Sequence, residues 1–130
     1  MSTIAAISTP NAVGGIAVIR ISGENAITVG QRIFRPFGEK KLELMPGYTC
    51  AYGEAIDNGN RIDDCILTIF RAPHSYTGEN TVEISCHGGL FVSRQILRAA
   101  LKNGAEPAGP GEFTKRAFLH GKMDLTEAES

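Results

Sequence analysis

An Asn-Gly pair between two long apolar runs is the feature that most constrains the fold of this chain. The pair lies in the segment DNGN, residues 57–60, and the flanking runs Tyr48–Ile56 and Ile62–Phe70 are expected to be strands. Asn and Gly both tolerate the positive φ that a tight two-residue turn requires, so this pattern is a strong signal for a β-hairpin. The fold must therefore contain a sheet with an antiparallel pair of strands.

The rest of the chain adds candidate strands and helices on both sides of this hairpin. Short apolar runs bounded by turn residues predict strands at Thr3–Ser8, Ile16–Ile21 and Val82–Cys86. Apolar residues at helical spacing predict helices at Glu24–Phe34 and Leu90–Lys102, the second capped by Asn103-Gly104. The resulting order, ββαβββα, predicts an α+β fold with a mixed or antiparallel sheet.

The C-terminal part of the sequence is read as a connection to a further domain. The segment EPAGPGE, residues 106–112, is typical of a linker or boundary loop. Beyond it, Asp124 with Glu127 and Thr126 with Glu129 are possible capping boxes, which predict the start of a helix. A helix that starts so close to Ser130 indicates a fragment of a longer protein.

Composition excludes several classes of protein. The 130 residues suffice for one domain, and a net charge of −1 lacks the basic excess of a nucleic-acid-binding module. No apolar run reaches the roughly 18 residues that span a bilayer, and the start MSTIAAIS is unlike a signal peptide. Cys50, Cys65 and Cys86 are too few and too widely spaced for a disulfide framework. These features predict a cytoplasmic protein without a membrane partner.

Several chemically reactive residues end the strand predicted at Val82–Cys86. Cys86 and His87 are adjacent there, but neighbouring side chains of a strand point to opposite faces, so a nucleophile–base pair is disfavoured and Cys86 is expected in the core. The histidines and cysteines show no metal-ligand spacing, and the P-loop pattern GxxxxGK[ST] is absent from the sequence. We therefore expect no catalytic residue and no metal site in this chain.

Two charged residues interrupt apolar strands. Arg20 alternates with Ile16 and Val18, and Glu83 lies between Val82 and Ile84, so both charges are expected to be buried. A buried charge is costly unless it is paired or contacts a ligand. The pattern leaves two interpretations open: a structural ion pair between Arg20 and Glu83, or a polar ligand pocket.

Three long motifs resemble one known family. They are GGIAVIRISG (residues 14–23), APHSYTGENTVEISCHGG (72–89) and GPGEFTKRAFLHGKMDLTEAE (109–129). In this order they resemble the N-terminal domain of the MnmE family, also called TrmE, of tRNA-modification GTPases; residues 27–56 are not diagnostic. The resemblance implies a folate-binding domain related to the glycine-cleavage aminomethyltransferase, which forms a homodimer by exchange of the first strands.

The resemblance also implies a ligand and the residues that contact it. The ligand is 5-formyl-tetrahydrofolate or a related tetrahydrofolate, which stands for the one-carbon donor. The family's folate contacts correspond to Arg20 in VIRISG, Glu83 in TVEIS and Lys122 in LHGKMDL. His120 stands where family members commonly have Asn, which we interpret as neutral variation near the pocket.

The family's chemistry lies partly outside this sequence. With the flavoprotein MnmG, the full-length proteins carry out the carboxymethylaminomethyl modification of the wobble uridine of tRNA. Their GTP, magnesium and potassium belong to a G domain that these 130 residues lack, so the chain alone is not expected to be an enzyme. We expect residues 1–118 to be the folate-binding and dimerisation domain, and 119–130 to connect it to a helical domain.

Two other functions remain open. One is a stand-alone folate-dependent enzyme like the aminomethyltransferase, which is disfavoured because such chains are longer and only Glu83 could supply a catalytic carboxylate. The other is a non-catalytic interaction module with a vestigial pocket.

Overall fold

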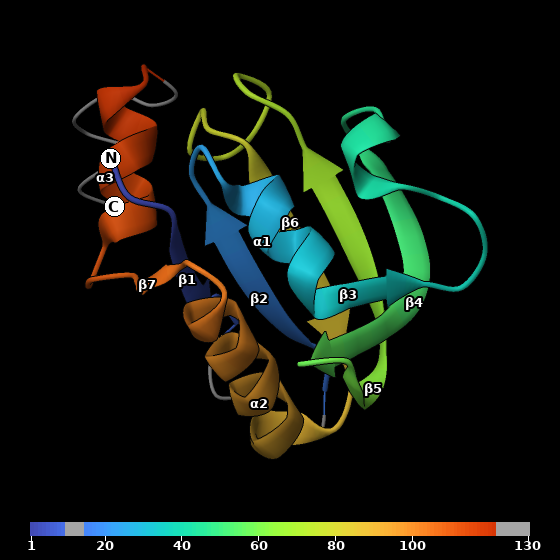
Figure 1. The fold of residues 1–130 in the computed structure, drawn as a ribbon. Helices are drawn as coiled ribbons and strands as arrows, with labels where there is room; N and C mark the ends of the chain where they lie inside the picture. The colour runs from blue at the N-terminus through green and yellow to red at the C-terminus, as the bar shows by residue number, and fades with distance from the viewer. Residues whose placement is uncertain (10–14, 122–130) are drawn as a thin grey trace.

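A computed structural model describes residues 1–9 and 15–121 of the chain. Its elements are β1 (Ile4–Ile7), β2 (Ala17–Ser22), α1 (Ala26–Ile33), β3 (Phe34–Pro36), the 3₁₀-helix η1 (Leu42–Leu44), β4 (Thr49–Asp57), β5 (Asn60–Phe70), β6 (Thr81–Cys86), α2 (Gly89–Lys102), β7 (Glu106–Pro107) and α3 (Glu112–Leu119) (Figure 1). The predicted α+β class is confirmed. The predicted elements all form in the predicted order, and the short strands β3 and β7, η1 and α3 are added to them.

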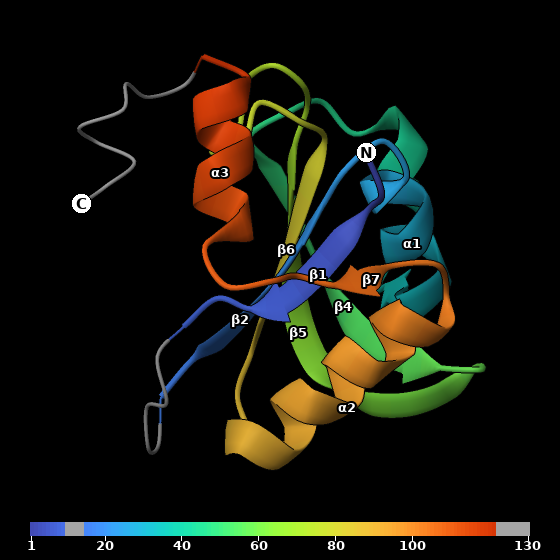
Figure 2. The same ribbon diagram turned by 90° about the vertical axis from the view of Figure 1, so that its left-hand side faces the viewer.

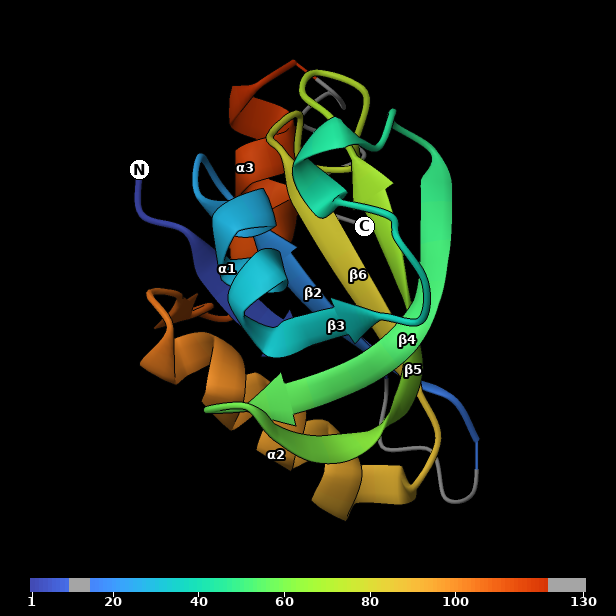
Figure 3. The same ribbon diagram turned by 45° about the vertical axis from the view of Figure 1, so that its right-hand side comes forward.

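The strands form a single mixed sheet. Its order is β3-β4-β5-β6-β2-β1-β7, and within the described residues only the β1–β7 pair is parallel. Strand β2 thus pairs with β6 in the register Arg20↔Glu83, although these residues are 63 positions apart in the chain, and β1 lies on the other side of β2. The long hairpin of β4 and β5 curves along its length (Figure 3).

The Asn-Gly turn forms as predicted. Asp57 pairs with Asn60, so the turn consists of Asn58 and Gly59 alone. Their φ angles are 52° and 83°, both positive, as a type I′ hairpin turn requires. Local sequence chemistry therefore specifies the geometry of this turn.

Helices α1 and α2 cover one face of the sheet and enclose the hydrophobic core. Strand residues of that face, such as Ile19, Leu67 and Ile84, are completely buried, as are Ile96 and Ala99 of α2. Burial of such aliphatic side chains supplies roughly 1.5–3 kcal/mol each, which makes this face the main source of stability. Figure 2 shows α1 on this side of the sheet and α3 on the opposite side.

The opposite face of the sheet is only partly covered. Next to α3, Ile4 and Ser22 are buried, whereas Tyr52 of β4 and Ile66 of β5 are 59% and 45% exposed. The expectation that both faces of the strand around Arg20 are buried is wrong: Ile16 is exposed, and Val18 and Arg20 are only partly buried. The strand is short and lies where α3 covers the sheet incompletely.

The segment read as a linker, residues 106–112, instead belongs to the fold. Glu106 and Pro107 form β7, which pairs with β1, and Glu112 begins α3. Gly111 precedes the helix at φ 69°, and the Gly109 N–H donates to the Glu112 carboxylate at 2.8 Å. The Pro and Gly residues here form the turn that precedes helix α3. A linker has a similar composition, so local composition alone does not distinguish the two. The helix start predicted at 124–129 lies outside the described residues.

Candidate ligand-binding site around Arg20

Arg20 and Glu83 form an ion pair across neighbouring strands. The two residues are register partners on β2 and β6, and the Arg20 Nε–H donates to Glu83 Oε2 at 2.9 Å. The side chains are 22% and 23% exposed, so the pair is partly hydrated. The predicted ion pair is therefore present, and it lies at the surface of the sheet where a ligand can reach it.

Two aromatic rings lie against the guanidinium of Arg20. The Arg20 Cζ atom is 5.1 Å from the ring centroid of Tyr76 and 5.3 Å from that of Phe113. Both distances are within the range of a cation–π attraction, which stabilises a cation by about 0.5–1 kcal/mol at a partly exposed site. We call Tyr76 and Phe113 the aromatic pair. Their contacts restrict the orientation of the Arg20 side chain, and its guanidinium group stays partly accessible.

A cavity of about 230 Å³ opens beside Arg20. It is lined by Ala6, Ile7 and Ser8 of the N-terminal strand region, by Arg20 and Tyr76, and by Ala108, Gly109 and Gly111–Thr114 at the start of α3. Pockets for complete drug-sized ligands have volumes of roughly 300–1,000 Å³, so this cavity admits a ring-sized part of such a ligand. The remainder of a larger molecule would extend over the uncovered part of the sheet.

The structure brings together two of the three predicted site residues. Arg20 and Glu83 are in contact, whereas Lys122 lies outside the described residues. The aromatic pair was missed by patterning, although Tyr76 and Phe113 stand in the motifs APHSYTGENTVEISCHGG and GPGEFTKRAFLHGKMDLTEAE. An aromatic residue among turn residues such as Pro and Gly, far from any apolar periodicity, is the signal that could have identified them.

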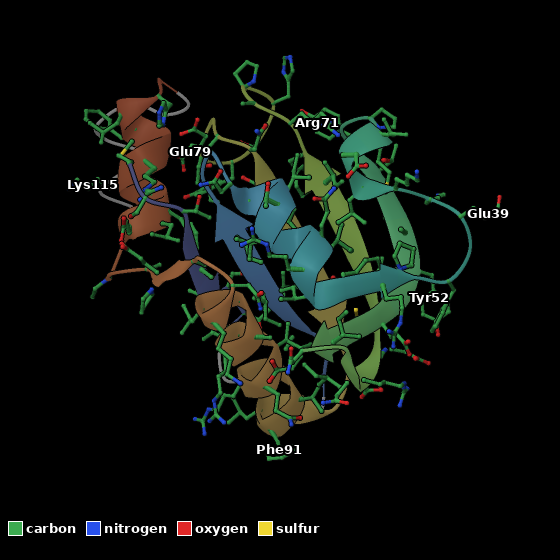
Figure 4. The ribbon with its side chains drawn as sticks, in the orientation of Figure 1. Glu39, Tyr52, Arg71, Glu79, Phe91 and Lys115 are labelled. Atoms are coloured by element: carbon green, nitrogen blue, oxygen red, sulfur yellow. The ribbon has the colours of Figure 1, made fainter. Side chains whose placement is uncertain are left out.

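A second set of charges lies between α3 and the loop that precedes β6. Arg116 is 2% exposed, and its Nη1 donates to the Ser2 carbonyl at 2.6 Å and to both carboxylate oxygens of Glu79 at 3.2 Å. Its Nη2 donates to Glu112 at 2.9 Å, and Glu79 also accepts a hydrogen bond from the Ser22 hydroxyl at 2.8 Å. We call these residues the α3 ion network. Figure 4 shows Glu79 between α3 and the end of β2.

Within this network the charged form of the Glu112 carboxylate is favoured. The hydrogen bond from the Gly109 N–H and the nearby Arg116 guanidinium lower the pKa of Glu112 below its ordinary value of 4.5.

At the other end of α3, Arg116 accepts a hydrogen bond at its carbonyl from the His120 N–H at 3.0 Å, and His120 Nδ1 lies 2.8 Å from the same oxygen. His120 thus caps the exposed end of α3.

The two reactive residues at the end of β6 differ in burial. Cys86 is buried in the core as predicted, and burial raises the pKa of its thiol to about 11. Burial likewise raises the pKa of Cys65, its cross-strand neighbour, to about 12. His87 is exposed, and no group of three or more His, Cys, Asp or Glu within residues 1–9 and 15–121 is placed to hold a metal ion. No helix in this part of the chain is long and apolar enough to cross a membrane.

Comparison with known proteins places this geometry in a family. Residues 3–122 match the family model described as GTP-binding protein TrmE N-terminus. The chain is 52% identical to the tRNA modification GTPase MnmE of Parabacteroides distasonis, over the whole chain and 29% of that protein. It is 53% identical to the protein of the same name from Caldicellulosiruptor saccharolyticus, over 98% of the chain and 28% of that protein.

The chain thus spans less than a third of the length of these relatives. The similarity extends through the two strands that carry Arg20 and Glu83 and through the α3 ion network. The family predicted from the three motifs is confirmed, and the chain belongs to the family of TrmE N-terminal domains.

Proposed function

We propose that this chain binds a tetrahydrofolate carrying a one-carbon group, such as 5-formyl-tetrahydrofolate, and that it serves as the homodimerising N-terminal domain of a cytoplasmic tRNA-modification protein. In this proposal the pterin ring lies at the cavity beside Arg20, and Arg20, Glu83 and Lys122 contact the ligand. The bound folate holds the carbon that is used, with the flavoprotein MnmG, in the modification of the wobble uridine.

The observation that carries this proposal is the partly exposed Arg20–Glu83 pair beside a cavity that contains aromatic rings. Of the N–H donors of Arg20, only Nε–H makes a hydrogen bond to the described residues. The Nη groups of Arg20 are therefore available to a carbonyl or carboxylate. Glu83 offers carboxylate oxygens, which accept paired N–H bonds such as those on the amide-like edge of a pterin. The site thus combines donors, acceptors and a flat apolar surface, which are the features a pterin needs.

Dimerisation is supported by the uncovered part of the sheet. Tyr52 and Ile66 are exposed on neighbouring strands, on the same face of the sheet as Arg20 and Glu83. Exchange of identical elements is a common route to symmetric dimers, and the first strand, β1, is only four residues long. Light scattering should therefore give twice the mass of the chain, and a monomer at high micromolar concentration with folate present would contradict this part of the proposal.

Other activities of the relatives are assigned to segments outside this chain. Their name includes GTPase activity, but the 130 residues contain no P-loop pattern. We therefore propose that GTP, magnesium and potassium bind a separate G domain. The folate domain would contribute the donor and the dimer, and contact tRNA only through the complete complex.

Isothermal titration with 5-formyl-tetrahydrofolate tests the proposal directly. We expect one folate site per chain, and we expect Lys122→Ala to weaken binding while the melting temperature stays unchanged. Arg98→Ala, an exposed substitution on α2, is the matched control and should bind like the unsubstituted chain. Absence of binding would favour a pure interaction module. Turnover of folate with a one-carbon acceptor and without MnmG would favour a stand-alone transferase.

A further inference from the structure

We propose that Arg116 is a positioning residue for the ligand site. In this view the α3 ion network holds α3 and the loop before β6 together, and thereby keeps the aromatic pair against Arg20. Arg116 itself does not contact the ligand. The inference about ligand affinity rests on the proposed function, whereas the inference about the position of Arg20 does not.

The first argument is how α3 is attached to the sheet. Only Arg116 and Ala117 of its eight residues are buried, while Phe118 and Leu119 are 39% and 55% exposed. A helix this short is not stable by itself in water and depends on its tertiary contacts. Because α3 buries little apolar surface, the polar contacts of Arg116 are the main interactions that determine its position.

The second argument is the spacing between the network and the aromatic pair. On α3, Phe113 precedes Arg116 by three residues, which is about one helical turn. In the loop, Tyr76 precedes Glu79 by the same three residues. The ion pair between Arg116 and Glu79 therefore joins the two segments that carry the two rings.

Next to the ligand site, a hydrogen bond between uncharged groups also joins the loop before β6 to α3. The Tyr76 hydroxyl lies 3.0 Å from the Thr114 hydroxyl, and within the loop Thr77 is buried and lies 2.7 Å from the Ser22 hydroxyl. The Arg20 Cζ atom lies 5.1 Å from the Tyr76 ring centroid and 5.3 Å from that of Phe113, so it contacts one ring from each segment. A movement of α3 away from the loop would thus separate the rings and release the guanidinium.

This arrangement predicts a local effect. The main hydrophobic core lies on the other face of the sheet, under α1 and α2, and includes neither ring of the aromatic pair. Loss of the α3 ion network should therefore displace α3 and the loop while the sheet stays folded. A residue of purely structural importance would lower the stability of the domain without a specific effect on Arg20.

NMR of the Arg20 Nε–H group in the 130-residue chain measures this position without any ligand. The double variant Glu79→Gln/Arg116→Met removes both charges of the buried pair. Glu112 also loses Arg116, but its side chain is 28% exposed and keeps the hydrogen bond from the Gly109 N–H. We expect the Arg20 Nε–H resonance to lose its ring-current shift and move toward that of a free arginine, while core amide resonances stay in place. Arg116→Lys keeps a charge that can meet Glu79, and should recover part of the shift. Arg98→Met on α2 is the matched control and should leave the resonance unchanged.

Titration with 5-formyl-tetrahydrofolate then measures the consequence for binding. We expect the double variant to bind at least tenfold more weakly, Arg116→Lys to be intermediate, and Arg98→Met to bind normally. If the unsubstituted chain does not bind folate, the proposed function fails, and the NMR result alone decides on Arg116. The proposal is overturned if the Arg20 resonance is unchanged in the double variant. Global unfolding of the double variant also overturns it, because the proposal predicts local displacement.

Discussion

Two arginine–carboxylate groups on the same side of the sheet differ in their access to water. Arg116 is 2% exposed and its Nη groups donate to Ser2, Glu79 and Glu112. Arg20 is 22% exposed, and among the described residues its only hydrogen bond is the one from Nε to Glu83. The two guanidinium groups have the same chemistry, but the unpartnered donor of Arg116, its Nε–H, is buried, whereas the unpartnered donors of Arg20 are accessible to a further molecule.

The difference shows how a fold separates attachment from binding. A buried charge that loses one partner is strongly destabilised, so a network such as that of Arg116 tolerates little change. A partly hydrated pair costs less to rearrange, because water replaces a lost partner. Arg20 and Glu83 can therefore exchange contacts with a ligand at low cost, whereas Arg116 and Glu79 hold the surrounding segments in place.

The largest effect is expected for Arg116→Met. Glu79, 12% exposed in its side chain, would lose its cationic partner, and removal of one member of a buried pair costs about 3 kcal/mol or more. Urea unfolding followed by circular dichroism should show this loss of free energy of unfolding. The double variant with Glu79→Gln should lose less, since only Glu112, whose side chain is 28% exposed, then loses its cationic partner. A double variant less stable than Arg116→Met would contradict the buried-charge explanation.

Glu83→Gln should affect ligand binding more than stability. The amide replaces an acceptor with a donor, so one pterin N–H would lose its partner, which costs roughly 1.5–3 kcal/mol of binding free energy. Calorimetric titration with 5-formyl-tetrahydrofolate measures this loss, and the melting temperature should change little. Glu54→Gln is the matched control, because Glu54 also pairs with arginine across strands but lies away from the cavity. Unchanged affinity in a folded Glu83→Gln variant would leave the ion pair with a structural role alone.

Glu112→Gln should have a smaller effect that depends on pH. The pKa of Glu112 is lowered in the folded state, so its carboxylate stabilises the fold above the ordinary value of 4.5 and loses this contribution as the pH falls through the folded-state pKa. The chain should therefore melt at a higher temperature than the variant at neutral pH, and the difference should shrink in acid. Melting curves over this pH range give the result; a difference independent of pH would exclude the carboxylate charge as its source.

The smallest effect is expected for Arg61→Gln. Arg61 forms ion pairs with Glu54, Asp63 and Asp64 on the exposed hairpin, and these contacts raise its pKa. Exposed ion pairs contribute little to stability because water solvates the separated charges. Neither the melting temperature nor folate affinity should change measurably. A clear loss of stability in this variant would contradict the view that an ion pair must be buried, as that of Arg116 is, to contribute strongly to the stability of the domain.

Local chemistry allowed much of the fold to be predicted. The turn of Asn58 and Gly59, the strands beside it and the long helix α2 follow from positive-φ residues and apolar periodicity. The α3 helix was not predicted, because its buried residues are Arg116 and Ala117 and it follows a Pro- and Gly-rich turn. Helices that are attached to a protein by polar contacts carry no apolar stripe for a sequence to display.

The candidate site was predicted only in part. Arg20 and Glu83 were identifiable because charges stand out in apolar strands, and their pairing is now observed. Tyr76 and Phe113 were not identified, since each lies outside any periodic segment. The assignment of Lys122 stays a prediction from the family motif.

The sequence by itself determined the hairpin, the order of the main strands and helices, and the family, because these depend on residues close together in the chain. The tertiary structure alone decided that the strand of Arg20 pairs with that of Glu83, and that α3 returns to the N-terminal segment. These contacts join residues 63 and 114 positions apart. No local preference specifies such a contact, because it forms only when the whole sheet assembles and the burial of one face brings the remaining charges together on the other.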